Sequence, residues 1–435
     1  MQHTRLASLV VAMTIAPALG AQSGSSIAGR VAAAPDGDVR LTYTTRPDVC
    51  GDGRDGVSIH RSMFFSERVE SYGSISGVRC VDGPARVTLT VRDHKVVSVR
   101  TRVGGNWPSG GTEATTDLGQ VSAPEAAAYF MSLAPQVEGR KQGPLLAAAV
   151  ADSVNIAPEM LRLARTTTLS RELRRRAVHW AGALGDASMV APLTELSRAN
   201  GSDRTSSDDV GPGDGLEGAA VGALSMIPDD AGVPALMTLA RSGSESVRKA
   251  AVFWLGQRDD EKAHALVRSV AGDAKETVAV RRAAIFALSQ GDGASSADFT
   301  FLRSLFDREP SEKLKEQVLF SVSQRESWDG GRWLLDKARD EAQPMEVRRK
   351  ALFWAGQGQA SVADILALYK SAREPRLREH VIFVLSQRSE EAATTALISI
   401  ARSDADREMR KKALFWLAQK DDPRVTKLIT DMVVR

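Results

Sequence analysis

The stretch Val247-Arg-Lys-Ala-Ala-Val-Phe253-Trp-Leu-Gly-Gln257 is repeated with variations until the end of the chain. Six versions occur, and their phenylalanines stand at 253, 286, 320, 353, 383 and 415, in steps of 33, 34, 33, 30 and 32 residues. A period of this length is typical of stacked helical hairpins. The sequence therefore predicts a solenoid in which each hairpin packs on its neighbours and a long surface stays open to partners.

Two looser units, Leu173–Trp180 and Leu216–Leu224, precede the six regular ones, and a polar insert at 200–215 separates them. About eight repeats are therefore expected over residues 173–435. Residues 122–172 read as helix and turn, and they begin at Ser122-Ala-Pro-Glu125, which has the residues of a capping box. This segment is either a helical cap or a degenerate repeat.

The order of helix, acidic turn, Val-Arg and Ala-rich helix resembles the HEAT-repeat superfamily, especially its short bacterial lyase-like repeats, over roughly residues 170–435. The resemblance implies a right-handed α-α superhelix whose Val-Arg helices line the concave side. Members of this superfamily are scaffolds, adaptors and a few cofactor-handling proteins, so the resemblance implies a fold and leaves the function open. The bulky phenylalanine and the closing glutamine are not part of the generic pattern.

Residues 39–121 alternate between apolar and polar side chains, as in Val39, Leu41 and Tyr43, which predicts a small antiparallel β domain before the mainly α solenoid. Asp93-His-Lys95 lies between two alternating runs and predicts a hairpin turn. Both cysteines, Cys50 and Cys80, fall in this region. We expect them to form one disulfide, and the alternative is two free thiols.

Residues 1–21 have the features of a secretory signal peptide. Arg5 precedes an apolar run from Leu6 to Leu19, which is shorter than the roughly 20 residues that cross a membrane. Ala18 and Gly20 supply a pattern for cleavage near residue 21. We expect an exported protein, periplasmic or secreted, with residues 22–38 as a mobile tail. The alternative is an uncleaved membrane anchor.

The charges of the chain nearly cancel, because 57 basic residues face 54 acidic ones for a net charge of +3. No net field exists to hold nucleic acid or an anionic membrane, so we expect neither nucleic-acid binding nor stable membrane insertion.

Helix geometry assigns roles to the positions of each repeat, counted from the leading apolar residue as zero. Positions zero, four, seven and eight form the predicted core stripe, for example Val347, Ala351, Trp354 and Ala355. Position one is basic in seven of the eight repeats: Arg174, Arg248, Arg281, Lys315, Arg348, Arg378 and Arg410. These cations are expected to stabilise the fold by bridging to acidic turn residues such as Glu245, Glu346 and Asp406. The alternative is a basic stripe for an anionic partner.

Position six carries the candidate partner-binding residues Phe253, Phe286, Phe320, Phe353, Phe383 and Phe415, and position ten adds Gln257, Gln290, Gln324, Gln357, Gln387 and Gln419. One hypothesis is an aromatic stripe that is open on the concave surface, where exposed apolar surface marks an interaction site. The other is that each phenylalanine packs against the next repeat and seals the stack.

The sequence offers no catalytic, cofactor-binding or metal-binding motif with a credible context. Gly51–Gly56 matches the string Gly-x-Gly-x-x-Gly, but predicted strands flank it on both sides, whereas dinucleotide binding needs a helix after the loop. The histidines are scattered and form no metal or general-base cluster. We therefore expect a non-enzymatic protein without cofactors.

These observations favour an exported interaction scaffold that binds a protein or peptide on the concave surface of the solenoid. One alternative is a self-associating structural or regulatory component of the cell envelope. A second alternative is a lyase-like protein that handles a chromophore or cofactor.

Overall fold

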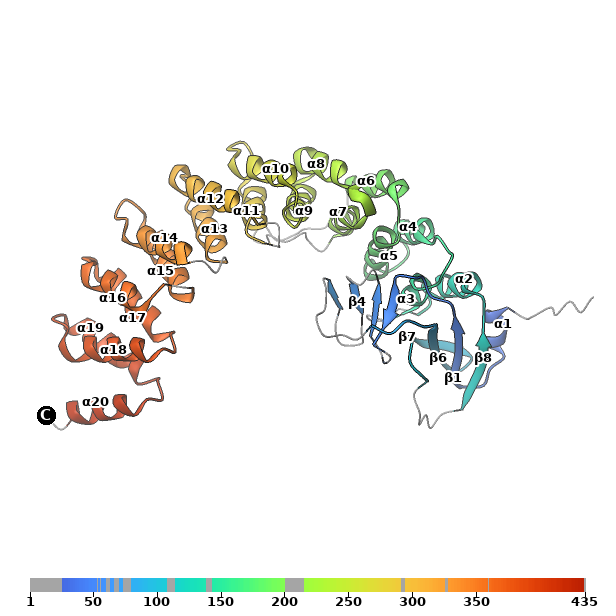
Figure 1. Cartoon of the computed structure of the whole chain (residues 1–435), viewed down its shortest axis with the longest axis horizontal. Helices are drawn as coiled ribbons and strands as arrows, with labels where there is room; N and C mark the ends of the chain where they lie inside the picture. The colour runs from blue at the N-terminus through green and yellow to red at the C-terminus, as the bar shows by residue number, and fades with distance from the viewer. Residues whose placement is uncertain are drawn as a thin grey trace, which may run out of the picture. The chain divides into compact units, whose positions relative to one another are not determined.

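The chain folds into two compact units, Met1–Val154 and Asn155–Arg435. The computed structural model describes residues 26–52, 54, 56–59, 63–65, 70–72, 80–107, 114–137, 143–199, 215–290, 294–324, 328–358 and 360–433. The predicted signal peptide at residues 1–21 lies outside these described residues. Two sheets lie in the first unit, and the repeated helical hairpins lie in the second (Figure 1).

The larger sheet of the first unit has the strand order β7-β6-β1-β8. Its strands are β1 Gly37–Tyr43, β6 Ala85–Arg92, β7 Lys95–Val103 and β8 Thr115–Gln120. In β1, Val39, Leu41 and Tyr43 are buried, and the residues between them are half-buried. The predicted alternation is confirmed, because successive side chains of a strand point to opposite faces of the sheet.

Strand direction differs across this sheet. β6 and β7 form the predicted antiparallel hairpin, with a turn at Asp93 and His94, whose φ angles are 47° and 56°. Positive φ at both turn residues suits a two-residue hairpin turn. β8 pairs parallel to β1, so the sheet is mixed, while its other pairs are antiparallel as expected. Alternating hydrophobicity marks a strand but carries no information about its direction.

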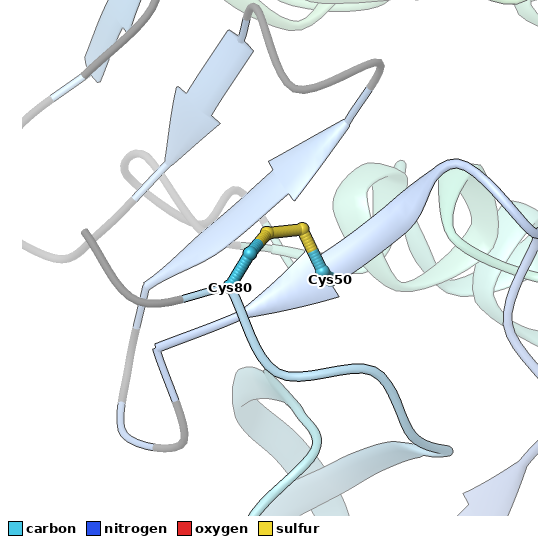
Figure 2. Close-up of a disulfide and its surroundings, with 2 residues drawn as sticks. All are labelled: Cys50 and Cys80. Carbon is cyan, nitrogen blue, oxygen red and sulfur yellow. A yellow bond between two sulfur atoms is a disulfide. The ribbon is translucent and has the colours of Figure 1, made fainter. Parts of the chain in front are cut away.

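The smaller sheet is antiparallel, with the order β2-β3-β4-β5. Its strands are β2 Val49–Gly51, β3 Val57–Ile59, β4 Met63–Phe65 and β5 Glu70–Tyr72. The predicted disulfide joins Cys50 in β2 to Cys80, whose Cα atoms are 5.4 Å apart (Figure 2). Beside it, Gly51 and Val81 exchange two backbone hydrogen bonds, of 3.0 and 2.7 Å. The disulfide therefore links β2, the first strand of this sheet, to the segment that leads into β6.

Residues 26–38 differ from the expected mobile tail, because they include α1, Ile27–Ala32, and the first two residues of β1. Ser26 caps the helix by accepting a hydrogen bond from the N–H of Gly29. Ile27 and Val31, four residues apart on one helix face, are buried. The N–H of Ile27 also donates to Oε1 of Glu125 (3.0 Å). In the predicted capping box, the N–H of Glu125 donates to the hydroxyl of Ser122 (3.3 Å), and the carboxylate of Glu125 serves α1.

The segment 122–172, expected to be one cap or degenerate repeat, is divided between the two units after Val154. Its helices α2, Ala123–Leu133, and α3, Pro144–Ala149, contact each other in the first unit, and α3 contacts β7. The hydroxyl of Tyr43 donates to the carbonyl oxygen of Ala147 (2.6 Å), and its ring lies 6.1 Å from that of Phe130. These buried contacts explain why α2 and α3 belong to the first unit.

Within the described residues, the second unit contains eight helical hairpins followed by α20, Pro423–Val433. The first helices of the hairpins are α4 Ala157–Arg165, α6 Val190–Arg198, α8 Val233–Ser242, α10 Glu261–Gly272, α12 Ser296–Arg308, α14 Trp328–Arg339, α16 Val362–Ser371 and α18 Glu391–Ser403. The second helices are α5 Arg171–Ala183, α7 Leu216–Met226, α9 Glu245–Gly256, α11 Val278–Ala287, α13 Glu312–Ser323, α15 Met345–Gln357, α17 Pro375–Ser386 and α19 Arg407–Leu417. The predicted solenoid of about eight repeats is confirmed.

The second helices form a layer of their own, because each contacts the second helix of the next hairpin from α5 to α19. In Figure 1, α9, α11 and α13 lie on the inner side of the row of hairpins, and α8, α10 and α12 lie on the outer side. This is the arrangement expected for the Val-Arg helices.

The buried face of the second helix α15 differs from the prediction at two positions, five and seven. On α15, positions zero, four and eight are buried as expected, and Leu352 at position five is buried as well. Trp354 at position seven, assigned to the core from the sequence, is only half-buried, and so is Trp416. Position seven is buried where it holds Trp180, Ala223, Ala287, Ser321 or Val384, as predicted, and half-buried only where it holds Trp254, Trp354 or Trp416.

Candidate binding surface

Position one of the second helices carries a cation that connects consecutive hairpins. On α15, Arg348 donates from Nε to the carbonyl oxygen of Ala338 at the end of α14 (3.0 Å). It also donates from Nη1 to Oε1 of Glu374, which immediately precedes α17 (2.6 Å). Arg248, Arg281, Lys315 and Arg378 likewise reach into the next hairpin, to Glu276, Glu309, Gln343 and Asp404. We call these five side chains, Arg348 included, the cation ladder.

The cation ladder confirms that position one stabilises the fold. The Arg348 side chain is only 4% exposed, so it presents no basic stripe to a partner. Of the acidic residues expected as partners, Asp406 lies 3.9 Å from Arg378 of the ladder, whereas Glu346 pairs with Arg349 (3.0 Å). The ladder reaches 26 or 28 residues ahead, to the segment just before the next second helix.

The six predicted phenylalanines lie along the second helices α9 to α19, and we call them the phenylalanine row. Phe415 is 60% exposed, and the other five are half-buried. The rings of Phe253 and Phe286 are stacked with centroids 6.4 Å apart, and those of Phe286 and Phe320 with centroids 6.1 Å apart. The rings therefore pack across the boundaries between hairpins and also keep part of their surface open.

Tryptophans at position seven interrupt the row. Trp354 lies between Phe320 and Phe353, with ring centroids 5.0 and 4.9 Å from theirs. At the start of the row, Trp254 occupies the space of a side chain on α7, because a Cβ at Gly222 would come 3.1 Å from its Nε1. This contact explains why the repeat containing Gly222 has no phenylalanine.

The predicted glutamines mostly bond within their own helix ends. The Nε2 groups of Gln290, Gln324 and Gln387 donate to the hydroxyl of the preceding serine at 3.3, 3.3 and 3.1 Å. Gln419 donates to the carbonyl oxygen of Phe415 (3.4 Å), and Gln357 is exposed. Gln257 differs, because its Nε2 is buried without a hydrogen-bond partner among the described residues. The glutamines therefore lie beside the row, and most of them form hydrogen bonds within their own helix end.

An open pocket of about 480 Å³ lies at the C-terminal part of the row, on α15, α17 and α19. Phe383 and Phe415 of the row line it together with Trp416. Its polar lining consists of Arg349, Arg376, Glu379, His380 and Lys412. Two of the predicted phenylalanines thus meet in a single concave site with charged side chains around them.

His380 is the uncharged polar group of this pocket. Burial, followed by the nearby charge of Arg349, lowers the pKa of His380 to about 4. Its ring is stacked on that of Phe383, with centroids 5.5 Å apart. Its Nε2 is buried and has no hydrogen-bond partner in the described part of the chain. At neutral pH the ring is therefore a neutral hydrogen-bonding group at the wall of the pocket.

Another buried charged cluster joins α10 to α12. His264 Nδ1 lies 2.7 Å from Oδ2 of Asp298, and Arg268 donates to Oδ1 of the same carboxylate (2.5 Å). Ser295 donates to Asp298 through its N–H and its hydroxyl and so completes a capping box. Because each oxygen of Asp298 is hydrogen-bonded within the hairpins, this cluster has a structural role.

Neither a metal centre nor a membrane span is found in the part of the chain that the structure describes. No group of three or more His, Cys, Asp or Glu side chains there is placed to hold a metal ion. No helix described there combines the length and apolar character needed to cross a bilayer.

Sequence reasoning missed Arg376, His380 and Lys412 as site residues and placed Trp416 in the core. A signal for these side chains does exist in the sequence. Arg376 precedes Phe383 by seven residues, and His380 and Lys412 each precede a phenylalanine of the row by three. Residues three, four and seven apart share one helix face, so these positions flank position six.

Residues 233–323 match the family model of HEAT repeats, and this range corresponds to three whole hairpins, α8–α9, α10–α11 and α12–α13. No curated protein matches the sequence.

The chain is similar to several solved structures. Human deoxyhypusine hydroxylase in complex with glycerol is 17% identical, and the match covers 60% of this chain and 94% of that chain with a TM-score of 0.25. The complex of CpcE and CpcF of phycocyanin lyase from Nostoc sp. is 19% identical, with coverages of 64% and 96% and a TM-score of 0.29. The Mot1 N-terminal domain in complex with TBP is 13% identical, with coverages of 73% and 40% and a TM-score of 0.29. The match to the repeat model and the hairpin pattern identify the second unit of this chain as a member of the HEAT-repeat superfamily.

Proposed function

We propose that the chain is an exported, non-enzymatic scaffold whose solenoid binds a segment of another protein along the phenylalanine row. The row itself is the observation that supports this most. Six phenylalanines from six consecutive hairpins keep part of their surface open on adjacent second helices. Partly exposed aromatic side chains in a contiguous array are typical of protein-binding surfaces.

Unsatisfied hydrogen-bond donors along the same helices support the proposal. Trp254 Nε1 and Gln257 Nε2 are buried and lack a hydrogen-bond partner among the described residues. Buried polar groups are nearly always hydrogen-bonded in folded proteins. If the two side chains rotate on binding, backbone carbonyl oxygens of a bound segment would accept these hydrogen bonds, which gives both donors a function in the complex.

The Cys50–Cys80 disulfide supports the export component of the proposal. Disulfides form and persist mainly in oxidising compartments outside the cytosol. The intact mass of the protein recovered from an envelope or secreted fraction tests this directly. We expect a mature chain that begins near residue 21, and a chain that retains Met1 would contradict cleavage.

Paired substitutions in the row test the binding function. The double variant Phe320→Ala with Phe353→Ala should lose a partner that the wild type captures from a native envelope fraction, as identified by mass spectrometry. Phe301→Ala is the matched control, because Phe301 is also half-buried but belongs to the first helix α12. It should leave capture unchanged.

Melting of the same variants separates binding from packing. Loss of capture with an unchanged melting temperature supports the open aromatic surface. A loss of several kcal/mol in the free energy of unfolding, with capture retained below the melting temperature, shows that the row only seals the stack. Light scattering addresses self-association, since concentration-dependent oligomers that the double variant abolishes would assign the row to contacts between copies.

A further inference from the structure

The pocket on α15, α17 and α19 has a surplus of positive charge. Arg349, Arg376 and Lys412 line it against one carboxylate, Glu379. With His380 neutral, the three cations and one anion that line this volume of about 480 Å³ leave a net charge of +2, or +1 when Glu346, the partner of Arg349, is counted. A concave site lined by one sign of charge attracts ligands of the opposite sign.

The three cations differ in their availability. The ammonium of Lys412 lies 2.6 Å from Oε1 of Glu379, and Arg349 is paired with Glu346. Arg376 is exposed, and it forms no hydrogen bond or ion pair among the residues that the structure describes. Its guanidinium is therefore the group most available to a carboxylate, for which its planar donors are well suited.

Aromatic surface adjoins this guanidinium. Phe415 is 60% exposed, and its ring meets that of Trp416 edge to face at 5.2 Å. The ring of Trp416 also lies 5.4 Å from that of Phe383. The pocket thus combines a fixed apolar wall with an unpaired cation, and a ligand that matches both must carry an acidic group beside an apolar one.

We infer that this pocket selects the partner by receiving an acidic side chain and an adjacent aromatic side chain of the bound protein segment. The inference rests on the proposed function, because Phe383 and Phe415 belong both to the pocket and to the phenylalanine row. The carboxylate pairs with Arg376, and the aromatic side chain packs on Phe415 and Trp416. Nucleic acid fits less well, since its affinity depends on many phosphate contacts and the whole chain has a net charge of only +3.

A peptide library tests the inference while the natural partner is still unidentified. Random dodecapeptides displayed on phage are selected against the immobilised full-length protein, and the enriched sequence is synthesised with a fluorescent label. The enriched sequences should contain Asp or Glu next to an aromatic residue. Binding of the synthetic peptide, measured by fluorescence anisotropy, should weaken as the salt concentration rises.

A double-mutant cycle then assigns the acidic residue to Arg376. Arg376→Ala and replacement of the peptide's acid by its amide should each weaken binding about fivefold, the range of a partly exposed ion pair. The two changes together should weaken binding no further than either alone. Arg402→Ala is the matched control, because Arg402 is an exposed arginine on the first helix α18. It should bind the peptide as the wild type does.

The outcomes separate this inference from the proposed function. If Arg376→Ala binds the peptide as the wild type does, while the Phe320 and Phe353 double variant loses it, the acidic preference is wrong and the aromatic surface stands. If Arg376→Ala and the amide replacement weaken binding additively in the cycle, the pairing with Arg376 is also overturned. If the folded wild type enriches no peptide at all, the proposed function falls together with the inference.

Discussion

Arg348 and Glu374 join two consecutive hairpins of the solenoid, with Nη1 of the arginine 2.6 Å from Oε1 of the glutamate. The same guanidinium also donates to the carbonyl oxygen of Ala338 in its own hairpin (3.0 Å). A buried guanidinium is tolerated only when its hydrogen-bond donors are satisfied. Each cation of the ladder therefore specifies where the next hairpin must lie.

Removal of one ladder cation should destabilise the solenoid. Arg348→Ala leaves the carbonyl of Ala338 and the carboxylate of Glu374 without their donor, and we expect a loss of about 2–4 kcal/mol in the free energy of unfolding. Arg348→Lys should recover less than half, because an ammonium cannot reproduce the fork of the guanidinium. Urea unfolding followed by helical circular dichroism measures the loss, with Arg402→Ala as the control. An unchanged urea midpoint for Arg348→Ala would refute the role of the ladder.

Close approach of α9 to α11 should make Gly256 intolerant of a side chain. A Cβ at this position would lie 2.7 Å from Cβ of Ala287 and 2.8 Å from its carbonyl oxygen. Gly256→Val should cost about 1–3 kcal/mol through forced displacement of the helices. Gly272→Ala is the comparison, because its Cβ would meet its nearest neighbour at 3.6 Å. It should be neutral or stabilise by about 0.4–1 kcal/mol, and equal costs at both sites would contradict the packing argument.

We expect the free energy of unfolding above pH 6.5 to depend on the protonation of His264. The hydrogen bond to Asp298 raises the pKa of His264 above its usual 6.5. The folded state thus holds the proton more tightly than the unfolded state, so this contribution is complete below pH 6.5 and is lost as the pH rises through the raised pKa. Urea midpoints between pH 6 and 9 should fall less steeply for His264→Gln than for the wild type. His94→Asn, at an exposed turn, serves as the control, and parallel pH profiles for wild type and His264→Gln would rule the linkage out.

His380 should reduce the stability of the fold at acid pH, whereas the contribution of His264 is lost at alkaline pH. Since burial lowers its pKa to about 4, the folded state resists protonation, and stability is lost as the pH falls from 6.5 through about 4. His380→Gln has no titrating group, so its melting temperature should decline less than that of the wild type over this interval. A steeper decline in the variant would show that the neutral ring is not the source of the acid sensitivity.

The disulfide should stabilise the first unit alone. Cys50 and Cys80 are separated by 30 residues, and closing a loop of that length is worth roughly 3 to 4 kcal/mol in the chain-entropy model. Calorimetry of the double variant Cys50→Ser with Cys80→Ser should show a lower transition temperature for the first unit. The transition of the solenoid should stay in place, and an equal shift of both transitions would argue against independent units.

The solenoid could be predicted from the sequence because the same residue types recur at the same positions in most hairpins. An apolar residue at position zero and a small one at position four repeat often enough to mark the helix, its buried face and the period together. The phenylalanine row followed from the same periodicity, and the structure places it along one layer of helices as expected. In the same way, the alternation of apolar and polar residues in β1 was sufficient to predict a strand.

Features that depend on distant parts of the chain could not be predicted. The helix α1 is too short for a periodic signal, and the bond from Ile27 to Glu125 spans 98 residues. The pocket combines side chains of three hairpins, so no single repeat reveals it. At position seven, Trp254, Trp354 and Trp416 were misassigned because they lie at the edge of the buried face, where the neighbouring hairpin decides their exposure.

The short reach of the cation ladder constrains how the number of hairpins can change in evolution. Each ladder cation finds all its partners in its own hairpin or in the one that follows. Duplication or deletion of one whole period would therefore regenerate the same interactions at the new junction. An indel inside one of the helices would misalign donor and acceptor, so genes for such arrays are expected to grow and shrink mainly in units of about 33 codons.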